Sequence, residues 1–222
     1  MRLGLRSHPE RLASVLSAVS WAWILSHSAR AQRFTCCQPH PSSSEEMSAW
    51  MLMVGAMMVP TTFLSLENIS LRSYRARRLR AVAAYLLGYV SCWLALGVAV
   101  VAARLLPVAH NPRAAPLLCA IAACWYVLPR RERWHRMCHR QIVLRPVGWD
   151  ADWDALRQGA VNGAPCVAMC WPLMVACALT DHNLVMMVGG TALVFYEKRM
   201  FRLRRLPLFV GAIALAGWTL TL

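Results

Sequence analysis

The residues with the clearest capacity for chemistry are three sulfur-bearing side chains, Cys166, Cys170 and Met174, in the stretch GAPCVAMCWPLM. They recur every four residues, so on a helix they would lie along one face. Thiolates and thioethers are the ligands that Cu(I) prefers, and thiolates also bind Zn(II). The spacing is therefore typical of a soft-metal site, with copper expected before zinc. Cys and Met with the same spacing also fill ordinary helix interfaces, so a packing role stays open.

A second set of donors lies in RRERWHRMCHRQ, where Cys138 is flanked by His135 and His139 within one helical turn. Five arginines surround this set. Positive charge favours the thiolate form of a cysteine, but it also repels an arriving cation. Two interpretations therefore remain: Cys138 and His139 are metal ligands, or this is a basic segment at a membrane surface.

Further sulfur and imidazole groups lie towards the N-terminus. The stretch MSAWMLMVGAMMVP is rich in methionine, which is typical of an adaptable packing surface and could also give Cu(I) a pathway along a helix. The pathway residues would be Met51, Met57 and Met58. A vicinal cysteine pair and a histidine precede this stretch and could capture metal outside the membrane; they are Cys36, Cys37 and His40.

The elements that must position these residues follow from composition. The chain is 58% hydrophobic and only 15% charged, whereas soluble domains carry about 25% charged residues. Its net charge of +14 does not indicate nucleic-acid binding, because the basic residues separate long apolar blocks. The sequence predicts an all-α fold, one polytopic transmembrane bundle over residues 1–222. About seven spans are expected, at residues 12–29, 47–66, 81–106, 113–129, 157–179, 183–197 and 206–222.

The links between these ranges predict the orientation. If alternate links face the cytoplasm, that side holds 20 Arg and Lys residues and the other side holds four. Because cytoplasmic loops collect basic residues, the N-terminus is expected inside and the C-terminus outside. Residues 1–31 also resemble a signal peptide cleaved after Ala31. Either interpretation leaves residues 32–46 outside.

Two further residues, Pro172 and Glu197, lead to specific structural predictions. Pro172 should interrupt the helix at 157–179 and leave the carbonyl of Ala168 without its usual donor. Kinked helices of this kind often line cavities. Glu197, at the end of another predicted span, is expected to pair with a nearby cation such as Arg199 or Arg202.

Five stretches together resemble a bacterial family of predicted metal-binding integral membrane proteins. They are MSAWMLMVGAMMVP, RRLRAVAAYLLGYVSCW, LPRRERWHRMC, NGAPCVAMCWPLM and YEKR. The resemblance implies a multi-pass protein of the bacterial inner (plasma) membrane. The chain departs from the family pattern at two cysteine positions, where it has Trp134 and Met169. The thiols of Cys138, Cys166 and Cys170 and the thioether of Met174 carry over.

No nucleophile–base arrangement, phosphate loop or zinc-protease pattern is present, so the sequence does not predict an enzyme. The favoured hypothesis is a membrane protein that binds or passes copper, with the bilayer and a metallochaperone or larger membrane complex as partners. The alternative is a metal-free membrane subunit or assembly factor. Thiol–disulfide exchange is least favoured, because Cys166 and Cys170 would lie about 6 Å apart along one helix.

Overall fold

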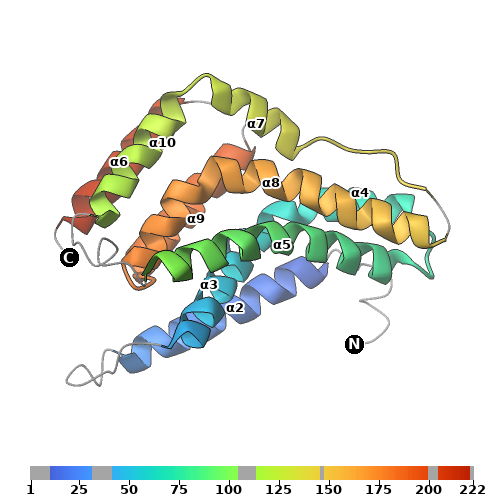
Figure 1. The fold of residues 1–222 in the computed structure, drawn as a ribbon, viewed down its shortest axis with the longest axis horizontal. Helices are drawn as coiled ribbons and strands as arrows, with labels where there is room; N and C mark the ends of the chain where they lie inside the picture. The colour runs from blue at the N-terminus through green and yellow to red at the C-terminus, as the bar shows by residue number, and fades with distance from the viewer. Residues whose placement is uncertain (1–10, 32–41, 105–113, 146–147, 200–204, 221–222) are drawn as a thin grey trace.

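The computed structural model describes residues 11–31, 42–104, 114–145, 148–199 and 205–220, and the regular elements in these ranges are all helices (Figure 1). The expected all-α class is thus confirmed for the described part of the chain. The elements are α2 (Arg11–Ala31), α3 (Ser43–Met57), the 3-10 turn η1 (Val59–Thr62), α4 (Phe63–Arg72), α5 (Arg78–Arg104), α6 (Ala114–Val127), α7 (Arg130–Cys138), α8 (Trp149–Leu179), α9 (Leu184–Arg199) and α10 (Arg205–Thr219).

Each of the seven predicted ranges overlaps a helix, but seven membrane spans are not supported. Within the described ranges, α5 and α8 are long and apolar enough to cross a bilayer, and α3 with η1 and α4 would make a third span bent by 42°. The bend occurs where Pro60 opens the 3-10 turn. Three other apolar helices are shorter, at Arg11–Ser26, Ala114–Val127 and Leu206–Thr219. The prediction counted apolar residues and not the unbroken helical length they form.

The central pair of the fold is α5 and α8, which lie against each other along much of their length (Figure 1). Glycines allow the two backbones to approach. A Cβ on Gly88 of α5 would overlap the carbonyl of Leu156, and a Cβ on Gly159 of α8 would overlap the carbonyl of Tyr85. Gly163 follows Gly159 by four residues and also faces α5. Small residues with this spacing are a common basis for close packing between membrane helices.

The two central helices run parallel, because polar contacts join their beginnings and their ends separately. At the beginning, Asp152 of α8 accepts hydrogen bonds from Arg77 at 2.6 Å and from Arg80 at 2.8 Å. At the end, Arg104 of α5 donates to the backbone carbonyl of Ala178. α8 begins at Trp149 and not at residue 157, so these early residues belong to the long helix itself.

The other helices surround this pair. α6 packs against both α8 and α10, and α7 packs along α8 (Figure 1). Residues 130–138, predicted as a connecting segment between spans, form the helix α7. α2 lies against α3, and the indole of Trp50 in α3 donates to the carbonyl of Trp93 in α5 at 3.0 Å. Helices far apart in the sequence therefore meet around the middle of α8.

Candidate metal site

α8 continues through Pro172, so the predicted interruption of the helix is absent, but the proline still determines the contacts in the middle of α8. The indole nitrogen of Trp125 in α6 donates to the carbonyl of Ala168 at 3.0 Å, which satisfies the group that Pro172 leaves without a helical donor. Arg131 of α7 donates to the next carbonyl, that of Met169, at 3.0 Å. The prediction about the Ala168 carbonyl is confirmed. The freed backbone anchors α6 and α7 on α8 beside Cys170.

Three of the predicted thiol ligands form a connected group at this place. Cys166 lies within interaction range of Cys138 of α7 and of Cys170, one turn further along α8. The Sγ atom of Cys138 also lies 3.6 Å from the Sδ atom of Met169. All four side chains are buried. Cys138, which is 28 or more residues away in the sequence, thus joins two thiols and one thioether of α8.

The segment after α7 is fixed to α8, and this attachment keeps Cys138 in place. Gln158 accepts a hydrogen bond from the backbone of Ile142 at 2.6 Å and donates to the carbonyl of Arg140 at 2.6 Å. Further along, both the backbone and the guanidinium of Arg145 donate to Asp154, at 3.1 and 2.9 Å. Residues 139–145 therefore run back along the first turns of α8 and hold the end of α7 against Cys166.

Polar side chains of α5 and α8 continue from the thiols towards this segment. The hydroxyl of Tyr89 and the Sγ atom of Cys166 are 3.1 Å apart. Tyr89 stacks on Tyr85 with ring centroids 6.3 Å apart, and Asn162 donates to the Tyr85 hydroxyl at 3.2 Å. Gln158 donates to Asn162 at 3.1 Å. The thiol of Cys166 is thus supported by a hydroxyl within a buried polar network.

A buried ion pair borders the thiols on the side of α9. Arg131 donates to both carboxylate oxygens of Glu197, at 2.7 and 2.6 Å, and its guanidinium lies 3.9 Å from the ring centre of Tyr126. The expected pairing of Glu197 with Arg199 or Arg202 is therefore wrong for Arg199, and Arg202 lies outside the described residues. A cation on another helix fills both carboxylate oxygens with bidentate geometry that a neighbour on the same helix would not readily supply.

The predicted auxiliary ligand His139 lies next to the thiol group without completing a metal site. His139 is exposed as a residue, its ring lies 5.1 Å from that of His135, and it is within electrostatic range of Cys166. Desolvation lowers the pKa of both imidazoles, so they tend to stay neutral. Across the described ranges, no three His, Cys, Asp or Glu side chains are arranged to hold a metal ion. The predicted donors are neighbours, and metal binding would require their side chains to rearrange.

The predicted methionine ligands are placed differently from one another. Met174 is fully buried one turn beyond Cys170, and Met57 and Met58 are buried in the core, whereas Met51 is half-buried. Met57 points from α3 towards α9, where its Cε atom would be 3.1 Å from a Cβ on Gly190. The predicted external capture residues lie outside the described residues; they are Cys36, Cys37 and His40.

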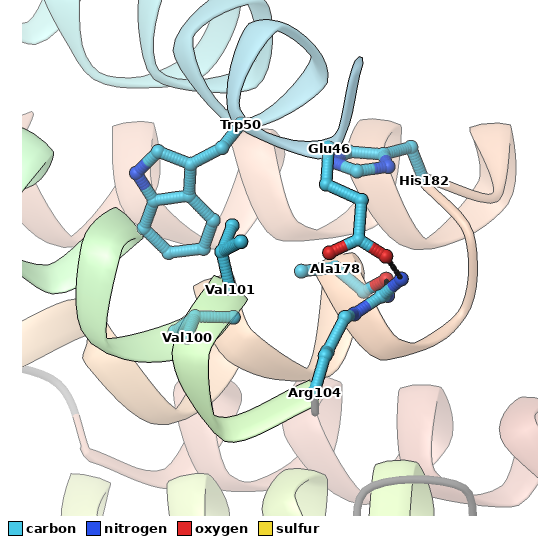
Figure 2. A pocket seen from close by; sticks show the side chains of 7 residues that line it. All are labelled: Glu46, Trp50, Val100, Val101, Arg104, Ala178 and His182. Carbon is cyan, nitrogen blue, oxygen red and sulfur yellow. Dashed lines mark hydrogen bonds and ion pairs between the residues drawn. The ribbon is translucent and has the colours of Figure 1, made fainter. Parts of the chain in front are cut away.

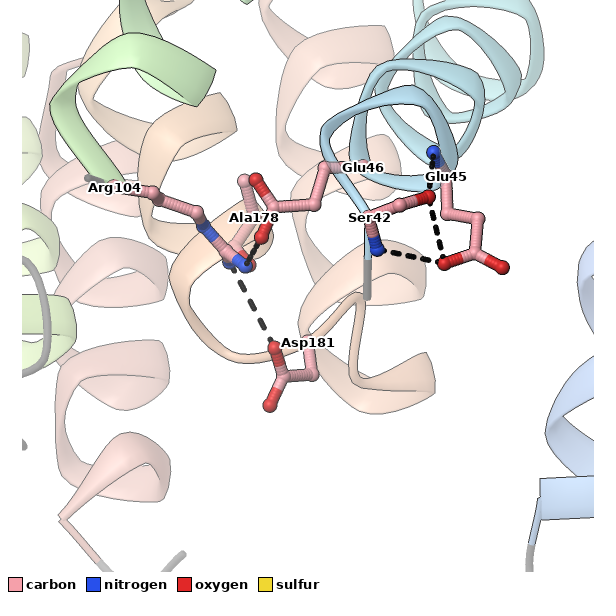
Figure 3. Close-up of polar contacts among 6 residues, drawn as sticks. All are labelled: Ser42, Glu45, Glu46, Arg104, Ala178 and Asp181. Carbon is pink, nitrogen blue, oxygen red and sulfur yellow. Dashed lines mark hydrogen bonds and ion pairs between the residues drawn. The ribbon is translucent and has the colours of Figure 1, made fainter. Parts of the chain in front are cut away.

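The opposite end of the bundle carries a second polar group, formed by α3, the end of α5 and the turn between α8 and α9. Arg104 donates to Glu46 at 3.1 Å and lies 3.7 Å from Asp181 (Figure 3). α3 begins here with reciprocal hydrogen bonds between Ser42 and Glu45, at 2.7 and 3.4 Å. This capping arrangement fixes the start of α3, and with it Glu46, against Arg104.

A small cavity of about 20 Å³ lies within this group, lined among others by Glu46, Trp50, Ala178 and His182 (Figure 2). The Nε2 atom of His182 is buried and has no hydrogen-bond partner in the described part of the chain. Burial lowers the pKa of His182 to about 4, and the positive charge of Arg104 acts in the same direction. The cavity has room for about one water molecule. Sequence reasoning did not identify it.

A family model described as PpoB2, copper chaperone, matches residues 47–222. The chain belongs to this family. The match includes every helix from α5 onwards and therefore all the residues of the thiol group. No curated protein sequence and no solved structure matches the chain. The family's description agrees with the copper that the cysteine and methionine pattern predicted.

Two site residues were not predicted from the sequence, and a usable signal was present for only the first of them. Met169 was counted as a lost cysteine, yet its thioether lies against Cys138 and is itself a soft donor. Arg131 was one of five arginines around Cys138, and its charge alone did not distinguish it from its exposed neighbours. Only the proximity of a buried carboxylate on α9 gives Arg131 its role.

Proposed function

We propose that the chain is an integral membrane copper chaperone that holds Cu(I) on sulfur ligands and passes it to another protein. The primary ligands are Cys138, Cys166 and Cys170. The supporting donors are Met169, Met174 and His139. The observation that carries the proposal is the contact of Cys138 with Cys166 and Met169, because it joins donors from two helices that are separated in the sequence.

The donor chemistry favours Cu(I) over zinc. Three thiols and nearby thioethers are soft ligands, which suit Cu(I). A structural zinc ion usually takes four ligands in a tetrahedral arrangement, commonly thiolates and imidazoles, and thioethers do not serve that purpose. Each thiol that binds Cu(I) releases its proton, and the ion keeps its oxidation state. To form the site, the side chains of Cys138 and Cys170 would rearrange about Cys166.

We further propose that the protein crosses the bacterial inner membrane, with the N-terminus inside, the C-terminus outside and seven crossings. The alternation of basic links supports this topology. The parallel arrangement of α5 and α8 agrees with it, since both would lead outwards from the inner side. α5 also presents an outward apolar face that suits lipid, with Leu87, Leu94 and Val98 exposed. The crossings by α6, α9 and α10, which have 14, 16 and 15 residues, would require a locally thinned bilayer or helices extended at their ends.

The test is the metal content of the detergent-purified full-length protein, loaded anaerobically with Cu(I) and, separately, with zinc. We expect at least one tightly bound Cu(I) per chain and no comparable zinc. The Cys166→Ser/Cys170→Ser double variant should lose this copper, whereas Cys124→Ser should keep it, because Cys124 is exposed, unlike the buried cysteines of the group.

An unchanged copper content in the double variant would contradict the proposal. A protein without copper that copurifies from native membranes with a stoichiometric partner, whether or not the cysteines are present, would instead support a metal-free membrane subunit. Gel filtration of each variant establishes that loss of copper does not reflect loss of the folded protein.

A further inference from the structure

The buried sulfur residues of α8 continue beyond the three predicted from the sequence. Cys166, Cys170, Met174 and Cys177 are separated by four, four and three residues, and each is at most 1% exposed. Eleven residues make just over three turns of an α-helix, so Cys177 returns to nearly the same angular position as Cys166. The four side chains therefore form one continuous stripe from the thiol group into the other half of the bundle.

Sulfur groups from two other helices meet Cys177 at the far end of this stripe. A Cβ on Gly190 of α9 would lie 3.1 Å from Cε of Met57 and 3.6 Å from Sγ of Cys177. Because Gly190 has no side chain, Met57 of α3 and Cys177 of α8 can both approach α9 at this position. Cys119 of α6 is fully buried and close enough to Cys177 to interact with it electrostatically. The Cys177 thiol has only a weak contact, at 3.6 Å, with the carbonyl of Met186.

We propose that Cys177, Met57 and Cys119 form a second Cu(I) site, and that Met174 connects it with Cys170. This inference rests on the proposed copper function and extends it from a single site to a path through the bundle. Two thiols and one thioether are a donor set that suits Cu(I). The donors come from α3, α6 and α8, as expected when a site is built between the helices of a bundle.

The spacing of the stripe suits movement of the ion by ligand exchange. Steps of three or four residues correspond to about 4.5–6 Å along the helix axis, so Cu(I) can bind the next sulfur before it leaves the last. The ion stays Cu(I), and each thiol releases a proton when it binds the ion and regains one when the ion leaves. The neutral thioether of Met174, placed between thiols, provides a weaker intermediate position, and conduction requires such sites to be weak enough to release the ion.

The second site lies beside the cavity at the opposite end of the bundle. Ala178, the residue after Cys177, lines that cavity together with Glu46, Arg104 and His182 (Figure 2). The sulfur stripe thus leads from the thiol group near α7 to the residue that precedes Ala178 of the cavity lining.

The experiment is a Cu(I) titration of the full-length protein in detergent, in competition with a chromogenic Cu(I) chelator. We expect two Cu(I) ions per wild-type chain. Cys177→Ser and Met57→Leu should each abolish or weaken the second ion by at least about tenfold while keeping the first. Cys166→Ser/Cys170→Ser should lose the first and keep the second. Cys124→Ser should bind as the wild type does.

The outcomes separate this inference from the proposed function. A wild-type chain that binds one Cu(I), lost in Cys166→Ser/Cys170→Ser and unchanged in Cys177→Ser, would overturn the second site and leave the first intact. A wild-type chain that binds no Cu(I) would overturn both. Met57→Leu preserves the size and apolar character of the side chain, so loss of the second ion in that variant, with an unchanged gel-filtration profile, would reflect a lost ligand and not a lost fold.

Discussion

Arg131 and Glu197 form a bidentate ion pair that is almost completely buried, with N–O distances of 2.7 and 2.6 Å and exposed fractions of 2% and 1%. The same guanidinium donates to the carbonyl of Met169 and lies over the ring of Tyr126. One side chain of α7 therefore contacts α6, α8 and α9. This arrangement holds α7, and with it Cys138, against the thiols of α8.

Breaking this pair from one side should strongly destabilise the protein. We expect Arg131→Met or Glu197→Gln to lower the free energy of unfolding by about 3–5 kcal/mol, because either change leaves a buried group without its partner. Combining Arg131→Met with Glu197→Leu should recover much of this loss. The measurement is chemical unfolding in detergent micelles. Arg133→Met, at an exposed position of the same helix, is the control, and an equal effect of both arginine changes would contradict the prediction.

The features that local chemistry determines were predictable from the sequence. The position of Cys166 and Cys170 on one buried helical face follows from spacing and apolar surroundings. The free carbonyl of Ala168 follows from Pro172 alone, since proline lacks the amide hydrogen. No local pattern in the sequence shows which side chain donates a hydrogen bond to that carbonyl. In the fold the donor is Trp125, which belongs to a different helix.

Features that depend on contacts between distant segments were missed. Cys138 reaches Cys166 because Gln158 and Asp154 hold the intervening segment, and no local pattern in the sequence predicts these contacts. Fewer than seven helices of the described residues are long and apolar enough to span a membrane, because apolar composition does not show how long an unbroken helix will be: α6 has only 14 residues. A glycine pair with GxxxG spacing, Gly159 and Gly163, was a local signal of close helix packing that went unused.

The close packing of α5 and α8 should be sensitive to a single methyl group. Gly88→Ala and Gly159→Ala would each place a Cβ against a backbone carbonyl of the partner helix, which cannot move aside as a side chain can. We expect each change to lower the free energy of unfolding by at least about 2 kcal/mol, comparable to overpacking a core.

Gly217→Ala in α10 is the matched control, because nothing lies within 4 Å of its Cβ position. That change should be neutral or stabilise by up to about 1 kcal/mol, owing to the higher helix propensity of alanine. Thermal unfolding of the purified variants measures both effects, and a Gly88→Ala protein as stable as Gly217→Ala would refute the interpretation.

The hydroxyl of Tyr89 should tune copper binding without serving as a ligand. It lies 3.1 Å from the Sγ atom of Cys166, where it can donate to the thiolate that forms when Cu(I) binds. Tyr89→Phe removes this donor and should weaken Cu(I) binding by about tenfold, within the range seen when groups that support metal ligands are removed. Tyr85→Phe is the control, since the Tyr85 hydroxyl accepts from Asn162. The measurement is chelator competition on both variants. Equal Cu(I) affinities of the two variants would contradict a role for the Tyr89 hydroxyl in copper binding.

His182 should make the stability of the protein depend on pH in a defined window. Its folded pKa is about 4, and the imidazole of an unfolded chain titrates near 6.5. Between these values the unfolded chain binds the proton and the folded protein does not, so the contribution of a neutral His182 is complete above about pH 6.5 and is lost as the pH falls towards 4. The charged groups that face His182 are Arg104, Glu46 and Asp181.

In His182→Gln this part of the pH dependence of stability should disappear. The difference in unfolding free energy between the two proteins should change by up to about 3 kcal/mol between pH 7 and pH 4. Denaturant unfolding at a series of pH values measures that difference, and a value that is constant across the window would show that His182 takes up its proton as readily in the fold as in the unfolded chain.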